Sequence, residues 1–158
     1  MKGNYLTLLE ESLRKKLKVM AEIQRYNQRQ QEIFQSENVD IDKFDEYVAE
    51  KGRLVDAVNA LDNGFEQLYA NVAGELKDNR EKYAEQIRTL QELVTEVTDT
   101  SVTIQAQEAR NKKLIEDYFK KERNGIKNGR QASKAAIGYY RTMNKSAVVT
   151  PVFLDSKK

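Results

Sequence analysis

Residues 44–72 read FDEYVAEKGRLVDAVNALDNGFEQLYANV. Nine residues of this stretch follow one another in alternating steps of four and three: Phe44, Val48, Lys51, Val55, Val58, Asp62, Phe65, Tyr69 and Val72. Such a seven-residue repeat is typical of a long helix that buries one stripe against neighbouring helices. Asn63-Gly64 favours a turn in other contexts, but the register is the same on both sides of it. We therefore expect Gly64 to lie within one helix.

Similar stripes lie on both sides of this stretch. In the first segment the apolar heptad positions hold Leu6, Leu9, Leu13, Met20, Ile23 and Phe34. Three positions of the same stripe are polar: Lys16, Asn27 and Gln30. Four further apolar residues lie along one edge of the stripe and widen it: Tyr5, Val19, Tyr26 and Ile33. A widened stripe is expected of a helix that packs against two neighbours. In the third segment the stripe holds Tyr83, Ile87, Leu90, Val94, Val97, Ile104, Ile115 and Tyr118. The chain therefore contains three long helical segments.

The expected fold is all-α: an elongated antiparallel bundle of three long helices at about 4–35, 40–74 and 80–121,. Asp40 is placed to cap the second helix. The second reversal is expected at 74–79, where the stripe weakens, with a helix that bends there as the alternative. We expect residues 1–122 to form the bundle. The remaining segment, 123–158, is expected to contain a short helix at 130–143 and a flexible tail.

Charge divides the chain in the same way. Residues 110–158 carry 13 Lys and Arg against 4 Asp and Glu, whereas residues 1–109 carry 14 against 21. The net charge of +2 therefore hides an acidic bundle and a basic C-terminal segment,. Binding of this segment to nucleic acid or to a membrane surface is one hypothesis, but no recognised nucleic-acid module is visible. Pairing with an acidic partner helix, or with the acidic bundle itself, requires fewer assumptions.

The absent residue types exclude much chemistry. The chain has no His and no Cys, which excludes most metal sites, His-based triads and cysteine nucleophiles. The glycines form no phosphate-binding loop, and no stretch is long and apolar enough to span a membrane. The N-terminus, MKGNYLTLLEESL, lacks the apolar run of a signal peptide,. We expect a cytoplasmic protein that is not an enzyme and needs no cofactor or metal.

The stripe of the third segment contains polar positions that need an explanation. Continued through the middle of the segment, its steps reach Ser101, Glu108 and Asn111. In one interpretation, small residues let the helices approach closely and Asn111 fixes their register, as buried polar groups do in coiled coils. In the other, this helix lacks a full set of neighbours and leaves a groove for the helix of a partner. A closed homo-oligomer would fill the same seam with a second copy of the chain.

Three sequence elements together resemble the FlgN-type flagellar export chaperones. They are the opening helix YLTLLEESLRKKLKVMAEI (5–23), the second helix FDEYVAEKGRLVDAVNALDNGF (44–65), and ARNKKLIEDYF (109–119) near the end of the third helix. In the last element, Asn111, Leu114 and Ile115 resemble the Asn-x-x-Leu-Ile pattern of the family. The resemblance covers roughly residues 4–120. The tail 144–158 has no counterpart in the family pattern.

The resemblance implies a small cytoplasmic helical chaperone. It would hold hook–filament junction subunits before their secretion through the flagellar type III apparatus, and the export apparatus is a further possible protein partner. In this family the C-terminal region binds the client. The residues of this chain that would inherit that role are Asn111, Leu114, Ile115, Tyr118, Phe119, Tyr139, Tyr140 and Met143. Two other hypotheses stay open: a self-associating coiled-coil protein, and an adaptor that uses its basic tail.

Overall fold

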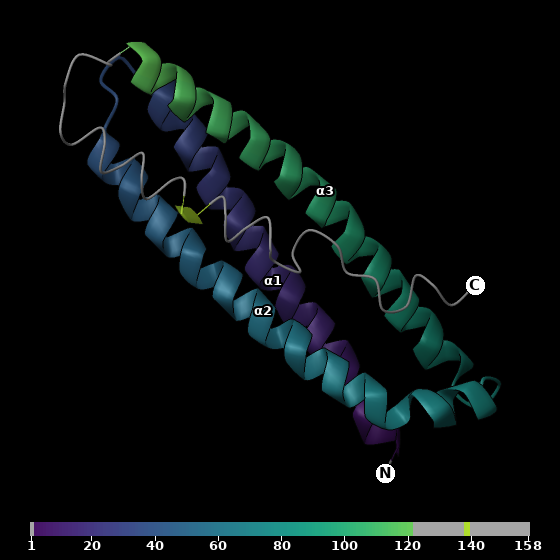
Figure 1. Cartoon of the computed structure of the whole chain (residues 1–158). Helices are drawn as coiled ribbons and strands as arrows, with labels where there is room; N and C mark the ends of the chain where they lie inside the picture. Colours follow the sequence, from purple (N-terminus) through teal and green to yellow (C-terminus); the bar gives the residue numbers. More distant parts are fainter. Residues whose placement is uncertain (1, 122–137, 140–158) are drawn as a thin grey trace.

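The structure is a computed structural model that describes residues 2–121 and 138–139. These residues form three α-helices and no strand: α1 (Lys2–Gln35), α2 (Ile41–Asp78) and α3 (Ala84–Lys121). The prediction of an all-α fold with three long helices is confirmed. Figure 1 shows an elongated body in which α2 runs antiparallel to α1 and α3. At 1.5 Å per residue, the 38 residues of α3 extend over about 57 Å,.

The first helix is the central one. α1 packs along both α2 and α3, whereas α2 and α3 make no comparable helix-to-helix contact in the part of the chain that the structure describes. The widened stripe of α1 is consistent with this position, because its flanking residues Tyr5, Val19 and Ile33 pack against the core. In the described residues, α2 and α3 therefore approach each other through side chains and not through close backbone contact.

Heptad periodicity correctly predicted the buried stripe of α2. Eight of its nine positions are buried, and Tyr69 is half-buried. Two polar positions of the stripes pair with each other across the α1–α2 interface: Lys16 Nζ lies 2.7 Å from Asp62 Oδ1, and the Lys16 side chain is only 2% exposed. A buried lysine is stable only when its charge is compensated. This ion pair therefore fixes the register between α1 and α2.

The second helix begins as expected but ends later than expected. Asp40 is its N-cap, since its Oδ1 accepts a hydrogen bond from the Lys43 backbone N–H at 3.0 Å. α2 continues through Gly74 to Asp78, four residues beyond the predicted end at 74. At its C-terminus, the backbone and side-chain N–H groups of Asn79 both bond to the Glu75 carbonyl. The last turns of α2 bend toward the start of α3 (Figure 1). The reversal follows at 79–83 and not at the predicted 74–79, and α3 begins at Ala84, four residues later than predicted.

The expected C-terminal elements lie outside the described residues. They are the short helix at 130–143, of which only Gly138 and Tyr139 are described, and the flexible tail that follows it. The sequence-based division into a bundle at 1–122 and a basic segment at 123–158 stays a prediction.

We expect Gly64→Ala to stabilise the protein. Gly64 lies inside α2, and a Cβ added there would meet no atom within 4 Å. Because glycine loses more backbone freedom than alanine when a helix forms, the substitution is expected to raise the free energy of unfolding by about 0.5–1 kcal/mol. Urea denaturation followed by far-UV circular dichroism measures this difference. A loss of stability would show that the helix does not continue through Asn63-Gly64.

Candidate functional site

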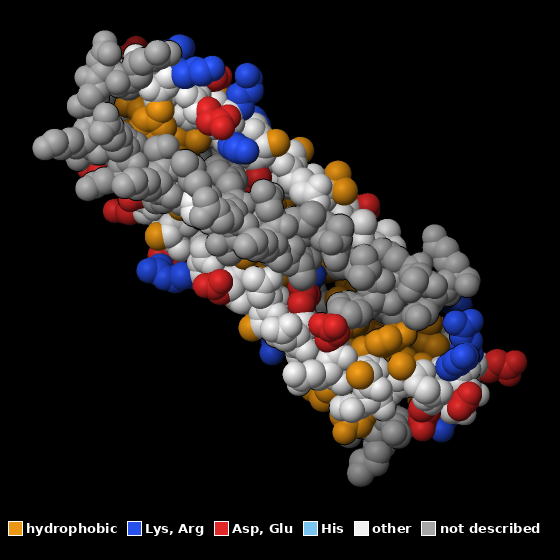
Figure 2. All heavy atoms as spheres, in the orientation of Figure 1, with side chains coloured by type: hydrophobic (Ala, Val, Ile, Leu, Met, Phe, Trp, Pro, Cys, Tyr) orange, Lys and Arg blue, Asp and Glu red, His pale blue; other side chains and the backbone are white. Residues whose placement is uncertain are grey.

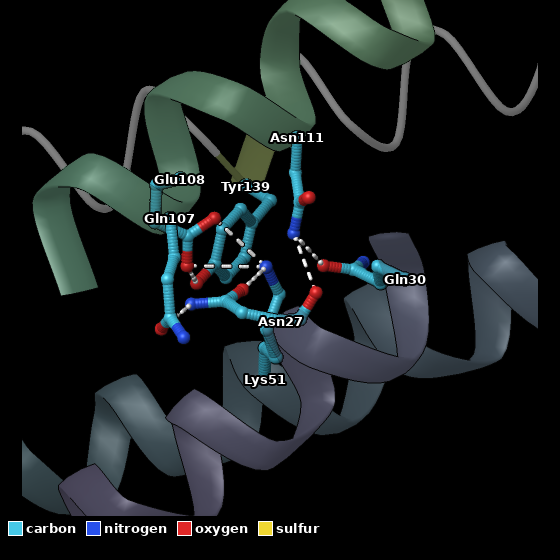
Figure 3. Close-up of polar contacts among 7 residues, drawn as sticks. All are labelled: Asn27, Gln30, Lys51, Gln107, Glu108, Asn111 and Tyr139. Atoms are coloured by element: carbon cyan, nitrogen blue, oxygen red, sulfur yellow. Dashed lines mark hydrogen bonds and ion pairs between the residues drawn. The ribbon is translucent and has the colours of Figure 1, made fainter. Parts of the chain in front are cut away.

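A cluster of seven polar residues lies between the three helices, nearer the end of the bundle at which α1 ends and α2 begins (Figure 3). It comprises Asn27 and Gln30 of α1, Lys51 of α2, Gln107, Glu108 and Asn111 of α3, and Tyr139. We call it the polar cluster. Five of its members occupy stripe positions, so heptad packing itself turns their side chains inward.

Lys51 is the central cation of the polar cluster, and its side chain is fully buried. Its Nζ donates to Asn27 Oδ1 at 2.6 Å and lies 2.8 and 3.1 Å from the two carboxylate oxygens of Glu108. These contacts reach both neighbouring helices. Lys51 therefore provides a link between α2 and α3 that their backbones do not make.

Burial determines the electrostatics of this lysine. It lowers the pKa of Lys51 from 10.5 to about 8, although the Glu108 carboxylate acts in the opposite direction. A buried lysine with a lowered pKa sometimes serves as a catalytic base or nucleophile. Here a carboxylate and an amide oxygen both accept hydrogen bonds from its Nζ. This is the arrangement of a structural ion pair, which perturbs pKa values without catalysis.

Asn111 connects α3 to α1. Its Nδ2 donates to the Asn27 backbone carbonyl at 2.9 Å and to Gln30 Oε1 at 3.3 Å. Asn27 Nδ2 in turn donates to Gln107 Oε1 at 3.2 Å. Because these bonds form only at one offset of the two helices, they specify the α1–α3 register. This agrees with the interpretation of the polar seam as a register device. The absence of an α2 neighbour beside α3 agrees with the other interpretation.

Tyr139 covers the polar cluster. It is only 6% exposed, its hydroxyl donates to Glu108 Oε2, and Lys51 Nζ lies 4.2 Å from the centroid of its ring. An ammonium over an aromatic face is an attractive cation–π contact. A single side chain from the C-terminal segment thus contacts both members of the ion pair.

An open hollow lies beside Tyr139. Its volume is about 460 Å³, and Gly138 and Tyr139 line it together with residues of α2, among them Val48, Gly52 and Val55. Asp45 also lines it, and burial, followed by the nearby Asp42, raises the pKa of that carboxyl group. The floor beside Tyr139 is therefore partly apolar and belongs mainly to α2.

The end of α3 carries a group of aromatic side chains. Tyr118 lies 5.8 Å from Phe34 and 5.3 Å from Phe119, and Phe34 lies 5.2 Å from Phe44, measured between ring centroids. Tyr118 and Phe119 are half-buried. This aromatic group lies where α1 ends and α2 begins, so all three helices contribute to it or border it.

A second hollow lies at the opposite end of the molecule. It has a volume of about 350 Å³ and is lined by apolar residues of α2 and α3, including Tyr69, Leu76, Ile87 and Leu90. On the face shown in Figure 2, hydrophobic side chains gather near both ends of the body, while charged side chains are scattered along its length.

The structure distributes the predicted partner-binding residues over different environments. Asn111 and Ile115 are buried against the bundle, at 0% and 3% exposure. Leu114, Tyr118 and Phe119 are half-buried at the end of α3. Tyr139 is buried on the polar cluster and follows Phe119 by 20 residues in the sequence. Tyr140 and Met143 lie outside the described residues.

Sequence reasoning named most residues of the polar cluster but did not predict how they pair. Lys51 and Asn27 were recognised as polar positions within apolar stripes, but not as partners of Glu108 and Asn111. The available signal was that opposite charges, Lys51 and Glu108, occupy stripe positions on different helices. Within 2–121 and 138–139, the side chains form no group of three that would suit a metal ion. No helix in those residues is long and apolar enough to cross a membrane.

Comparison with known proteins identifies the family. Residues 1–146 match the FlgN protein family, which covers all three helices and Tyr139. The chain belongs to the FlgN family. No match was found among curated proteins or among solved structures. FlgN membership indicates a flagellar export chaperone, and the family is not known for enzymatic activity. The FlgN match also extends over the C-terminal residues up to 146, beyond the end of the resemblance noted from the sequence.

Proposed function

We propose that this FlgN-family protein holds flagellar hook–filament junction subunits in the cytoplasm before type III secretion, and that it binds them through its C-terminal helical region. The observation that carries the proposal is the group of half-buried apolar side chains at the end of α3: Leu114, Tyr118 and Phe119. An amphipathic helix of a client would find apolar anchors there. Chaperone binding of this kind requires no catalytic group.

The position of these side chains supports a binding role. Tyr118 and Phe119 contact each other and the aromatic group of α1, so their rings are held in place before a client arrives. Leu114 is half-buried one turn earlier and is not part of the hydrophobic core. Preorganised apolar anchors reduce the entropy lost on binding. Leu114 is therefore the residue at which client binding can be weakened with the least damage to the bundle.

We expect Leu114→Gln to weaken client binding about tenfold or more, since burial of a leucine side chain contributes about 1.5–3 kcal/mol. Glutamine has nearly the same helix propensity as leucine, so the helix should persist. The matched control is Leu8→Gln, because Leu8 is 44% exposed on α1, near the opposite end of the molecule. Isothermal titration calorimetry with purified hook–filament junction subunits from the same organism measures both variants.

Equal affinities of Leu114→Gln and the wild-type chain would contradict binding at the end of α3. Co-purification from the native organism, read by mass spectrometry, addresses the function itself. A secreted flagellar subunit in the purified complex supports the chaperone role. Recovery of copies of this chain alone would instead support a self-associating coiled-coil protein.

A further inference from the structure

We propose that Tyr139 is an internal latch: it occupies the polar cluster in the free chaperone and leaves it when a client binds. This inference rests on the proposed function and adds a regulatory step to it. The latch consists of one side chain, Tyr139, and its seat consists of Lys51 and Glu108 with the hollow beside them.

Tyr139 contacts one charged residue on each of the two outer helices. Lys51 belongs to α2 and Glu108 to α3, two helices whose backbones make no close contact in the described residues. Tyr139 contacts both, with its ring toward the ammonium and its hydroxyl toward the carboxylate. Tyr139 thus joins α2 and α3 on a side of the bundle where their backbones lack close contact in the described residues. This is the side on which a further helix would have two outer helices to pack against.

The space around Tyr139 is not fully packed. Protein interiors are normally packed as densely as organic crystals, yet an open hollow of about 460 Å³ adjoins Tyr139. Gly138, the residue before it, is exposed. Tyr139 is therefore a buried side chain that borders an exposed glycine and an open hollow. Atoms that face a hollow lack packing partners on that side, which lowers the cost of moving the side chain.

Lys51 and Glu108 would stay paired with each other after Tyr139 has left. Lys51 would keep its contacts with Glu108 and Asn27, which are supplied by the three helices alone. Neither charge would be left buried without a partner, and water could reach both. Opening of the latch therefore avoids the large penalty of an unpaired buried charge. A contact with these properties can form and break while the bundle stays folded.

A latch lowers the apparent affinity for the client, because only the open fraction of the chaperone can bind. The apparent dissociation constant is the intrinsic one divided by that fraction. If about one molecule in ten is open, removal of the latch raises the affinity about tenfold. A side chain that contacts the client would have the opposite effect, and its removal would lower the affinity.

The test uses the full-length chain and purified hook–filament junction subunits as the probe. Affinity is measured by isothermal titration calorimetry for the wild type, Tyr139→Ala and Tyr139→Phe. We expect Tyr139→Ala to bind about tenfold more tightly. Tyr139→Phe keeps the ring and loses the hydroxyl bond, so a gain of about threefold is expected. Circular dichroism checks that the helices persist.

The matched control is Tyr83→Phe. Tyr83 is also buried, and its hydroxyl also donates to a glutamate, Glu75 Oε2 at 3.2 Å, but it lies at the other end of the bundle. This control removes the same kind of hydrogen bond without touching the seat. We expect its affinity for the client to equal that of the wild type.

The outcomes separate the latch from the proposed function. Equal affinity of the wild type and Tyr139→Ala would overturn the latch and leave the chaperone role intact. Weaker binding by Tyr139→Ala would make Tyr139 a client contact, which also overturns the latch. If the subunits bind none of the variants, the proposed function itself fails and the latch fails with it. Tighter binding supports both, and misfolding cannot produce it.

Discussion

Replacement of Lys51 by methionine is expected to lower the free energy of unfolding by about 3–5 kcal/mol, the usual cost of removing one partner of a buried ion pair. Methionine is close to lysine in length and is a good helix former, so the loss is not one of helix propensity. The cost arises at Glu108, which is only 5% exposed and loses its cation. Asn27 Oδ1 loses its donor in the same step.

The double variant Lys51→Met/Glu108→Leu should recover most of this loss. Replacement of both members of a buried pair by apolar residues of similar volume is often neutral or stabilising. Lys43→Met is the matched surface control, because Lys43 lies on the same helix and pairs with Glu46 at 3.7 Å with both side chains exposed. An exposed pair of this kind contributes about 0–1 kcal/mol.

Urea denaturation of the four proteins at pH 7 measures these differences. Two results would contradict the interpretation. A loss below 1 kcal/mol for Lys51→Met would mean that water reaches the Glu108 carboxylate and solvates it. A double variant as unstable as the single one would mean that the loss comes from packing at position 51 and not from the unpaired charge.

The periodicity of the sequence was sufficient to predict which face of each helix is buried. Ser101, Glu108 and Asn111 interrupt the apolar stripe of α3 and were still expected at buried positions. Their exposures are 1%, 5% and 0%. The rule holds for polar residues because a helix of this length buries a whole stripe, and any side chain on that stripe is carried inward. Which face of a helix is buried thus depends on the residue pattern of that helix alone.

The pairing of the polar residues could not be predicted in the same way. A seven-residue repeat leaves the offset between two helices undetermined, since a shift of one heptad, about 10 Å, restores the same pattern of buried faces. Lys51 meets Glu108, and Asn111 meets Asn27, at only one of these offsets. Specific contacts of this kind choose the offset, and they become visible only when the helices are placed side by side.

The position of Tyr139 is even harder to predict from a sequence pattern than the pairing of the polar residues. Residues 122–158 show no heptad stripe, so no periodicity indicates which of their side chains returns to the bundle. Tyr139 lies 31 positions after Glu108, and its contact depends on charges from two different helices. The sequence interpretation assigned this residue to partner binding. Its contact within the chain is a separate observation, and the latch experiment distinguishes the two roles.

The pH dependence of stability provides a direct test of the buried lysine. The pKa of Lys51 is about 8 in the folded chain, against 10.5 as its ordinary value. Between these two values the unfolded chain holds a proton on Lys51 that the folded chain has lost. The unfolded state then binds more protons, so the free energy of unfolding rises as the pH rises. This sign is opposite to that of a lysine stabilised by an exposed carboxylate.

We expect a gain of about 2 kcal/mol in the free energy of unfolding between pH 8 and pH 9.5, because each pH unit contributes at most about 1.36 kcal/mol. The quantity to measure is the difference between the wild type and Lys51→Met/Glu108→Leu, since all other titrations then cancel. The upper limit of pH 9.5 stays below the ordinary pKa of tyrosine side chains, about 10.

A flat or falling difference would show that Lys51 keeps its proton above pH 8. The contacts with Glu108 and Asn27 would then outweigh the cost of burial, and the ion pair would be a net source of stability. A rising difference means the reverse: the helices tolerate a costly buried cation because it links α2 to α3. In that case the ion pair fixes the arrangement of the two helices that Tyr139 contacts without adding net stability, and Lys51→Met/Glu108→Leu should be nearly as stable as the wild type at pH 7.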